Sequence, residues 1–315
     1  MNEFLTSSNI VGIDIGNLTT VAYSNLGEFI VESRVGEASK MDEFVNEGDI
    51  FGFNNQILVT NSGTFENDTI KFKKGNFLTL LNLAIAKTTD RDNVSIVIGI
   101  PAGQYSSLRD EMKQFILENN KNQIRLGNGY DNLNRVRDIT IENVFVVPEG
   151  YGLKTEAKIV EQCKENVNTY VVDVGGGTTD IAVFGPKFKF LDGDSIRFGL
   201  LDLYSETRKK INSTFNVSVS LEDSKKYMDG ELELLDENFE KQYRSPLIQK
   251  AASRIISDFN LSYPDARTSN IVLDGGGAKK MEYFFKQKYP QVIVAGDVIG
   301  QARSLYKIGV KKWIK

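Results

Sequence analysis

VVDVGGGTTD, residues Val171 to Asp180, repeats a phrase that the chain has already used once, VGIDIGNLTT at Val11 to Thr20. Both copies read Asp-x-Gly-x-x-Thr-Thr. In both, an apolar run precedes the acidic residue and a second apolar run, VAYS or IAVF, follows the threonines. Two apolar runs joined by a glycine-containing turn predict a β-hairpin. A hairpin in each half of the sequence predicts a chain built from two related halves.

The tip of each hairpin has the chemistry needed to bind phosphate. Gly16 and Gly175 lack the Cβ atom that would keep backbone N–H groups away from an anion. The other tip residues in the candidate site are Asn17, Leu18, Thr19 and Thr20 in the first copy and Gly176, Gly177, Thr178 and Thr179 in the second. For one copy alone, an ordinary hairpin capped by Asp and Thr is the alternative. Neither copy matches the GxxxxGKS/T or GxGxxG phosphate motifs.

Asp14 and Asp173 occupy the strand end in the two copies. A carboxylate at this place can reach a hydrated magnesium ion, because Mg²⁺ keeps several waters and binds one or two carboxylates together with substrate phosphates. The repeated motif therefore predicts a site for a polyphosphate and its magnesium ion.

Two further motifs supply glycines and a carboxylate. IVLDGGGAKK, Ile271 to Lys280, places Gly275 to Gly277 after an apolar strand, with Lys279 close behind. Such a turn lets a nucleoside lie against the backbone, and a plain strand-to-helix turn is the alternative. VFVVPEGYG ends a strand at Pro148 and presents Glu149, which could orient or deprotonate a water that attacks a terminal phosphate. A solvated loop glutamate is the alternative here.

The order DxGxxTT, PEG, DxGGGTTD and LDGGGA resembles the actin-type ATPase superfamily of actin, the seventy-kilodalton heat-shock chaperones and the sugar kinases. Within it, the sequence is most similar to the ParM type of bacterial plasmid-segregation actins, on IVIGIPAGQY at Ile96 to Tyr105, TIENVFVVPEG at Thr140 to Gly150, and chain length. The similarity runs from about Val11 to Gly309. It implies an α/β, actin-like (ribonuclease-H-like) fold of two domains with a nucleotide cleft between them.

The resemblance also implies roles for individual residues. Asp14 and Asp173 hold magnesium through water, and Glu149 positions the hydrolytic water. Gly16, Gly175, Gly176 and Thr178 match the phosphate hairpins, and Gly275, Gly276 and Gly277 match the turn against the adenosine. In the helix expected at Leu200 to Thr214, helical spacing gathers the mainly apolar residues Leu200, Leu203, Tyr204, Thr207 and Ile211 on one face. The polar face, with Glu206, Lys209 and Lys210, would touch the ribose and base, or else be solvated.

One position departs from actin, which has a lysine in its first hairpin where this chain has Val21. Another group must then neutralise the phosphates. Lys71, Lys73 and Lys74 fall in the segment expected to form a small subdomain, but the sequence does not place any of them at the site.

Composition excludes several other chemistries. The 315 residues contain no histidine, which removes Ser-His-Asp and Cys-His catalysis and imidazole metal sites. The single Cys163 has no partner for an intramolecular disulfide and is expected to pack within a helix at Tyr151 to Lys164. A net charge of −4 argues against direct, phosphate-driven DNA binding. No signal peptide or membrane span is recognised, so we expect a cytoplasmic protein whose C-terminal VKKWIK packs as a helix rather than anchoring in a membrane.

Strands and helices alternate along the chain, which is typical of α/β architecture. The expected strands are Asn9 to Ile15, Val94 to Ile100, Val144 to Val147, Thr169 to Val174, Ile271 to Leu273 and Val292 to Val294. The expected helices are Ser107 to Asn119, Tyr151 to Lys164, Leu200 to Thr214 and Pro246 to Leu261. We expect domain I at residues 1–166 plus a C-terminal helix at 300–315, with a small subdomain at about 31–90. Domain II would span 167–299, with an insert at about 199–264.

Three functions fit these motifs. The resemblance favours a filament-forming protein that segregates plasmid DNA, hydrolyses ATP or GTP with Mg²⁺, and meets its cargo through a DNA-binding adaptor of the ParR type at a centromere-like site. The alternatives are a chaperone-type ATPase and a small-molecule kinase of the same fold. Sedimentation with and without nucleotide separates the first from the other two.

Overall fold

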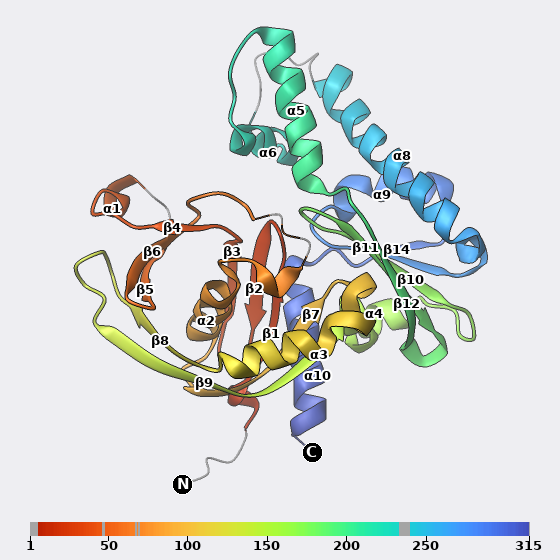
Figure 1. Ribbon diagram of the computed structural model, residues 1–315. Coiled ribbons are helices and arrows are strands. Elements are labelled where there is room, and N and C mark those ends of the chain that lie inside the picture. Colours follow the sequence, from red (N-terminus) through yellow and green to blue (C-terminus); the bar gives the residue numbers. More distant parts are fainter. Residues whose placement is uncertain (1–5, 46–47, 67, 69, 233–239, 315) are drawn as a thin grey trace. The chain divides into compact units, whose positions relative to one another are not determined.

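The computed structural model describes residues 6–45, 48–66, 68, 70–232 and 240–314 (Figure 1). The chain forms two compact units. Unit 1 comprises Met1–Glu161, Asp192–Asp194 and Asp297–Lys315, and unit 2 comprises Gln162–Leu191 and Ser195–Gly296. The sequence analysis put these divisions at about 166 and 299. Each unit is described by itself below.

Unit 1 contains a sheet in the order β3-β2-β1-β7-β9-β8-β5-β6-β4. The strands are β1 Ile10–Ile15, β2 Thr19–Tyr23, β3 Glu28–Glu32, β4 Val35–Glu37, β5 Ile50–Phe53, β6 Gln56–Thr60, β7 Asn93–Ile100, β8 Lys121–Leu126 and β9 Arg135–Pro148. The neighbours β1, β7 and β9 run parallel, so their carboxyl ends meet at one edge of the sheet. The long strand β9 also pairs antiparallel with β8, and only its last part was expected from the sequence.

Helices cover both faces of this sheet. They are α1 Asp42–Val45, α2 Phe77–Thr88, α3 Ala102–Glu118, α4 Ala157–Val160 and α10 Val298–Trp313, together with the short 3₁₀ turns η1 Ser7–Asn9, η2 Lys71–Lys73 and η3 Tyr151–Thr155. The core on one face combines alternate residues of β1 and β7 with α2, which is buried along almost its whole length, and α3. On the other face α10 packs against Val97 and Val147. The alternation of side chains along each strand explains why one strand serves both cores.

Residues Tyr151 to Lys164 do not form the continuous helix that the sequence predicted. It contains the turn η3 and the four-residue helix α4, and Cys163 lies in neither. Cys163 is half-buried, and burial raises the pKa of its thiol. The left-handed backbone of Gly150, with φ of 79°, and the 3₁₀ turn after it start the segment in a geometry that a continuous α-helix would not use.

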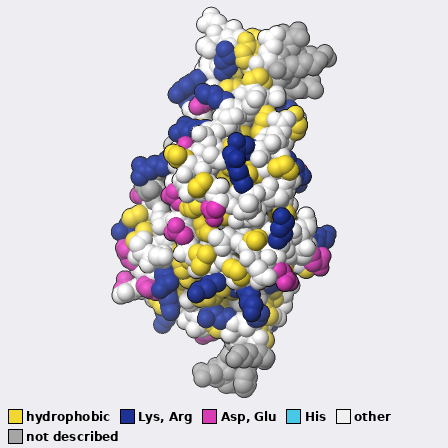
Figure 2. Space-filling model, turned by 90° about the vertical axis from the view of Figure 1, so that its right-hand side faces the viewer, with side chains coloured by type: hydrophobic (Ala, Val, Ile, Leu, Met, Phe, Trp, Pro, Cys, Tyr) yellow, Lys and Arg dark blue, Asp and Glu magenta, His cyan; other side chains and the backbone are white. Residues whose placement is uncertain are grey.

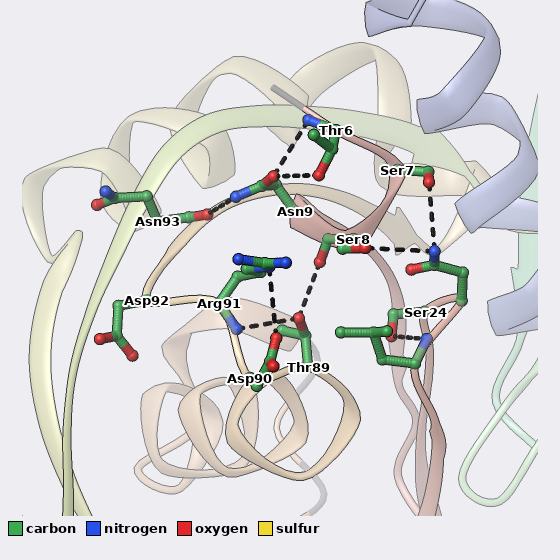
Figure 3. Close-up of polar contacts among 12 residues, drawn as sticks. Thr6, Ser7, Ser8, Asn9, Ser24, Thr89, Asp90, Arg91, Asp92 and Asn93 are labelled. Atoms are coloured by element: carbon green, nitrogen blue, oxygen red, sulfur yellow. Dashed lines mark hydrogen bonds and ion pairs between the residues drawn. The ribbon is translucent and has the colours of Figure 1, made fainter. Parts of the chain in front are cut away.

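A polar network fixes the edge of the unit 1 sheet where β1 and β7 begin (Figure 3). The Asn9 side chain donates to the carbonyl oxygen of Asn93 at 2.8 Å and accepts from the backbone N–H and the hydroxyl of Thr6. Thr89, just after α2, donates from its hydroxyl to the carbonyl oxygen of Ser8 at 2.8 Å. These bonds join the residues just before β1 to the connection between α2 and β7. They lie at the amino ends of β1 and β7, away from the carboxyl ends.

Unit 2 contains a second sheet, in the order β12-β11-β10-β13-β14. Its elements are β10 Thr169–Val174, β11 Thr179–Gly185, η4 Pro186–Phe188, β12 Lys189–Ile196, α5 Leu200–Phe215, α6 Leu221–Asp229, η5 Glu240–Arg244, α8 Ser245–Ser262, η6 Pro264–Thr268, β13 Asn270–Asp274, α9 Ala278–Lys288 and β14 Val292–Val294. Strands β10, β13 and β14 run parallel. The predicted buried face of α5, Leu200, Leu203, Tyr204, Thr207 and Ile211, is confirmed.

The surface carries charges of both signs. On the face drawn in Figure 2, lysine and arginine side chains are intermixed with acidic and apolar ones. Among the helices that the structure describes, none combines the length and the apolar character required to cross a membrane.

Candidate functional site

The first hairpin joins β1 to β2 through a tight turn. The Gly16 N–H donates to the carbonyl oxygen of Thr19 at 2.9 Å, and the strands pair from Ile15 opposite Thr20 outward. A Cβ atom on Gly16 would lie 2.9 Å from that same oxygen. Glycine is therefore required at this position for the turn to close.

The second hairpin, between β10 and β11, repeats this geometry in unit 2. The Gly175 N–H donates to the carbonyl oxygen of Thr178 at 3.0 Å, and Val174 pairs with Thr179 as Ile15 pairs with Thr20. Helix α5 begins directly on this turn, because the N–H groups of Leu200 and Leu201 donate to the carbonyl oxygens of Gly175 and Gly176. The sequence repeat is thus also a repeat of backbone hydrogen bonding.

Two carboxylates from the strands on either side of β7 share one cation in unit 1. Asp14 lies near the end of β1, and Glu149 follows β9 with its N–H donating to the carbonyl oxygen of Ile100 at 2.9 Å. The Nζ atom of Lys71 lies 2.6 Å from Oδ1 of Asp14 and 2.7 Å from Oε1 of Glu149. A third bond runs from the same Nζ to the carbonyl oxygen of Gly99, at 3.2 Å.

Lys71 is only 4% exposed, so its charge depends on these partners. Burial alone would lower the pKa of Lys71, but the carboxylates of Asp14 and Glu149 outweigh burial and raise this pKa above its ordinary value. The absence of a side chain at Gly99 leaves room for the cluster, because a Cβ there would lie 3.3 Å from Cγ of Glu149 and 3.6 Å from Oδ1 of Asp14.

A second lysine from the same segment contacts the first hairpin. The ammonium of Lys74 donates to Oδ1 of Asn17. Burial, and then the charge of Lys71, lower the pKa of Lys74 to about 8. Lys73 instead forms a 3.1 Å ion pair with Glu111, and both of these side chains are half exposed.

Sequence reasoning left these three lysines unassigned, and no local signal separates them. Their roles depend on how the chain returns from β6 to the carboxyl ends of the parallel strands. The 3₁₀ turn η2 then points Lys71 to the carboxylates and leaves Lys73 outside.

The third glycine cluster lies beside the second hairpin within unit 2. Gly275 has φ of 82°, a conformation that favours glycine, and the Gly277 N–H donates to the carbonyl oxygen of Val174 at 3.0 Å. Asp173 is 9% exposed, and Gly275 packs directly against its carboxylate. The structure therefore brings Asp173, the hairpin and the glycine turn together.

The polar residues predicted on α5 have other described contacts. Glu206 forms a 2.8 Å ion pair with Lys250 of α8, and the Nζ atom of Lys210 lies 4.7 Å from the centroid of the Tyr243 ring. Lys209 and Lys279 are exposed. The described contacts of Glu206 and Lys210 join α5 to α8 and to the segment before it, so a role in holding a ribose or base stays a prediction.

The donor chemistry fits magnesium held through water. Among the described residues, no group of three or more His, Cys, Asp or Glu side chains forms a direct metal cage. In unit 1 Asp14 lies at the first hairpin and shares Lys71 with Glu149, and in unit 2 Asp173 lies at the second hairpin. Such carboxylates suit a hydrated Mg²⁺ that is bound mainly by phosphates.

Comparisons with known proteins agree with this architecture. Residues 12–152 match the family model described as actin-like proteins N-terminal domain. A ParM filament structure from Clostridium botulinum, described as 15-stranded, superposes with a TM-score of 0.80 at 16% identity and covers 99% of this chain and 100% of that chain. An archaeal actin homologue, Ta0583, superposes with a TM-score of 0.78 at 16% identity, covering 96% and 99%. Its complex with ADP gives 0.77 at 17% identity, with the same coverage. No curated protein sequence matches the chain.

Proposed function

We propose that this protein, whose residues 12–152 match the model of the actin-like protein N-terminal domain and whose fold is actin-like, is a nucleotide-dependent filament protein that segregates plasmid DNA. The observation that carries the proposal is the repeated hairpin, with the same glycine-to-threonine backbone bond and the same strand register in each unit. Each copy has a carboxylate at its base. Each hairpin would bind phosphates of ATP or GTP.

Different residues of the chain would then bind the phosphates, the magnesium and the attacking water. At each glycine turn, backbone N–H groups would hold phosphate, and the carboxylate beside the turn, Asp14 or Asp173, would hold Mg²⁺ through water. When bound, the magnesium supplies charge neutralisation at the β- and γ-phosphates. Glu149 would orient the attacking water, since it shares the cation Lys71 with Asp14.

Filament formation supplies the mechanical function. The structural neighbours include ParM filaments, which supports head-to-tail self-association as the mode of assembly. The net charge of −4 favours an adaptor of the ParR type as the bridge to a centromere-like DNA site, because direct phosphate binding needs clustered cations. We place this activity in the cytoplasm, where both the nucleotide and the plasmid are present.

Light scattering, sedimentation and electron microscopy of the purified chain test this proposal. Scattering should rise on adding Mg-ATP or Mg-GTP, fall as nucleotide is consumed, and persist with a non-hydrolysable analogue. Chelation of magnesium by EDTA should abolish the rise. A chain that binds and hydrolyses nucleotide but stays monomeric at every concentration tested would refute the filament. Phosphorylation of a small molecule would then favour the kinase alternative.

A further inference from the structure

The lysine between the two carboxylates of unit 1 has a property that the proposed function does not explain. All three N–H donors of Lys71 have an acceptor, namely Asp14, Glu149 and the Gly99 carbonyl oxygen, at 2.6, 2.7 and 3.2 Å. The two carboxylate side chains are 15% and 14% exposed, so solvent screens this charge cluster weakly. Lys71 thus supplies a positive charge in direct contact with both carboxylates.

We propose that Lys71 is a resident counter-ion, a positioning residue that holds Asp14 and Glu149 in place without metal and gives up Asp14 when the magnesium nucleotide binds. This inference rests on the proposed function for the identity of the incoming cation. Its physical basis is competition, because the Asp14 oxygen that faces Lys71 cannot at once face a hydrated cation along the same direction. Lys71 then prevents Mg²⁺ alone from binding, and nucleotide phosphates are required to displace it.

A purely structural role would not require a charge at this place. Ion pairs buried to this degree are often no more stabilising than apolar side chains of similar volume, since both charges lose hydration. Removing one partner is costly because it leaves the other charges uncompensated. Lys71 is one cation shared by two carboxylates, so its removal leaves two negative charges and creates a site that another cation can occupy.

The same turn offers a matched control. Lys73 lies two residues along the chain, carries the same charge and pairs with Glu111 on the half-exposed side of η2. Lys71→Met and Lys73→Met make the same chemical change, but only the first removes the ammonium that contacts both Asp14 and Glu149. Lys71→Arg keeps the charge and tests whether charge alone is sufficient.

The experiment measures the melting temperature of the nucleotide-free, full-length chain as MgCl₂ is added, with NaCl at equal ionic strength as the reference. Wild type, Lys73→Met and Lys71→Arg should show no magnesium-specific shift. Lys71→Met should melt lower without magnesium and regain several degrees with MgCl₂ but not with NaCl, because a ligand that binds only the folded state raises its stability. Equal responses of Lys71→Met and wild type, whether both shift or neither does, would overturn the proposal.

A second variant covers the case in which Lys71→Met does not fold. Lys71→Met with Glu149→Gln leaves one charged carboxylate, Asp14, so less repulsion remains, and it should still show a magnesium-specific shift. If it shows none, the proposal is wrong. Binding of a fluorescent nucleotide to the same samples separates the two proposals, because a wild type that binds no nucleotide refutes the proposed function whatever the magnesium titration gives.

Discussion

A Cβ atom on Gly275 would lie 2.1 Å from Oδ1 of Asp173. The glycine turn after β13 is therefore built against the carboxylate at the end of β10, its parallel neighbour. We expect Gly275→Ala to displace this carboxylate and to strain a backbone whose φ of 82° favours glycine. The left-handed conformation alone costs about 1–2 kcal/mol for an alanine. Calorimetric unfolding should show at least this loss, and magnesium-dependent nucleotide binding should weaken.

Gly276→Ala is the matched control for this change. Its Cβ would make an ordinary contact, 3.6 Å from Cδ1 of Leu200. A free energy of unfolding near the wild-type value is expected. Equal losses of stability in the two variants would show that the contact with Asp173 is not what matters.

The packing of α10 on β1 gives a second prediction. A Cβ on Gly12 would lie 2.1 Å from the carbonyl oxygen of Ala302 and 2.3 Å from the backbone nitrogen of Tyr306. Because backbone atoms cannot rotate away, Gly12→Ala should cost about 3 kcal/mol or more, at the upper end of overpacking effects. Urea unfolding and limited proteolysis of the C-terminal helix measure this. Gly27→Ala, whose Cβ would lie 3.4 Å from the nearest atom, should change little.

Hydrolysis provides the third prediction. Glu149→Gln should bind nucleotide but slow turnover by on the order of 10² to 10⁴, because the amide cannot act as a base for the attacking water. Filaments should then outlast those of wild type. The exposed Glu142 of β9, the strand that precedes Glu149, is the control, and Glu142→Gln should keep the wild-type rate. Turnover by Glu149→Gln within a factor of about two of wild type would remove Glu149 from the mechanism.

Alkaline stability tests a contact in the unit 2 core. The Tyr170 hydroxyl donates to Oδ2 of Asp265 at 2.7 Å, and burial, followed by this carboxylate, raises the pKa of Tyr170 to about 12. The folded state therefore holds the phenolic proton more tightly than the unfolded state, whose tyrosine pKa is 10.0. The resulting stabilisation is complete below pH 10 and is lost as the pH rises towards 12.

Tyr170→Phe should lower the free energy of unfolding at neutral pH by about 1 kcal/mol, the usual net contribution of one hydrogen bond. Its stability should then fall less steeply than that of wild type between pH 10 and 12. Tyr283→Phe, at a side chain 64% exposed, should follow the wild-type pH curve. A Tyr170→Phe curve parallel to wild type over this range would contradict the assignment.

Much of the fold could be predicted because periodicity and glycine turns are local signals. The strands Thr169–Val174 and Val292–Val294 have the predicted bounds, and the buried face of α5 follows from helical spacing alone. The first half of β9 was missed because polar and charged residues such as Arg135, Arg137 and Asp138 interrupt its apolar pattern. Antiparallel pairing with β8 holds this half of β9 in a strand, although its local sequence does not indicate one.

The candidate site, too, could be predicted only in part from the sequence. The hairpin glycines and Asp14 could be identified from a repeated motif. Lys71 could not, because no motif surrounds it and its partners are 57 and 78 residues away along the chain. Which of three nearby lysines reaches the carboxylates is decided by tertiary structure.

The position of α10 in unit 1 also bears on how the protein is made. The ribosome produces β1 before unit 2, but the helix that covers one face of that strand is made only after all of unit 2. Domains generally fold as units during synthesis. Val97 and Val147 of unit 1 therefore stay uncovered until Leu305 and Ile308 have been made. A released chain that ends before residue 298 should accordingly expose this apolar sheet face to chaperones, which a chaperone-binding assay against the full chain would measure.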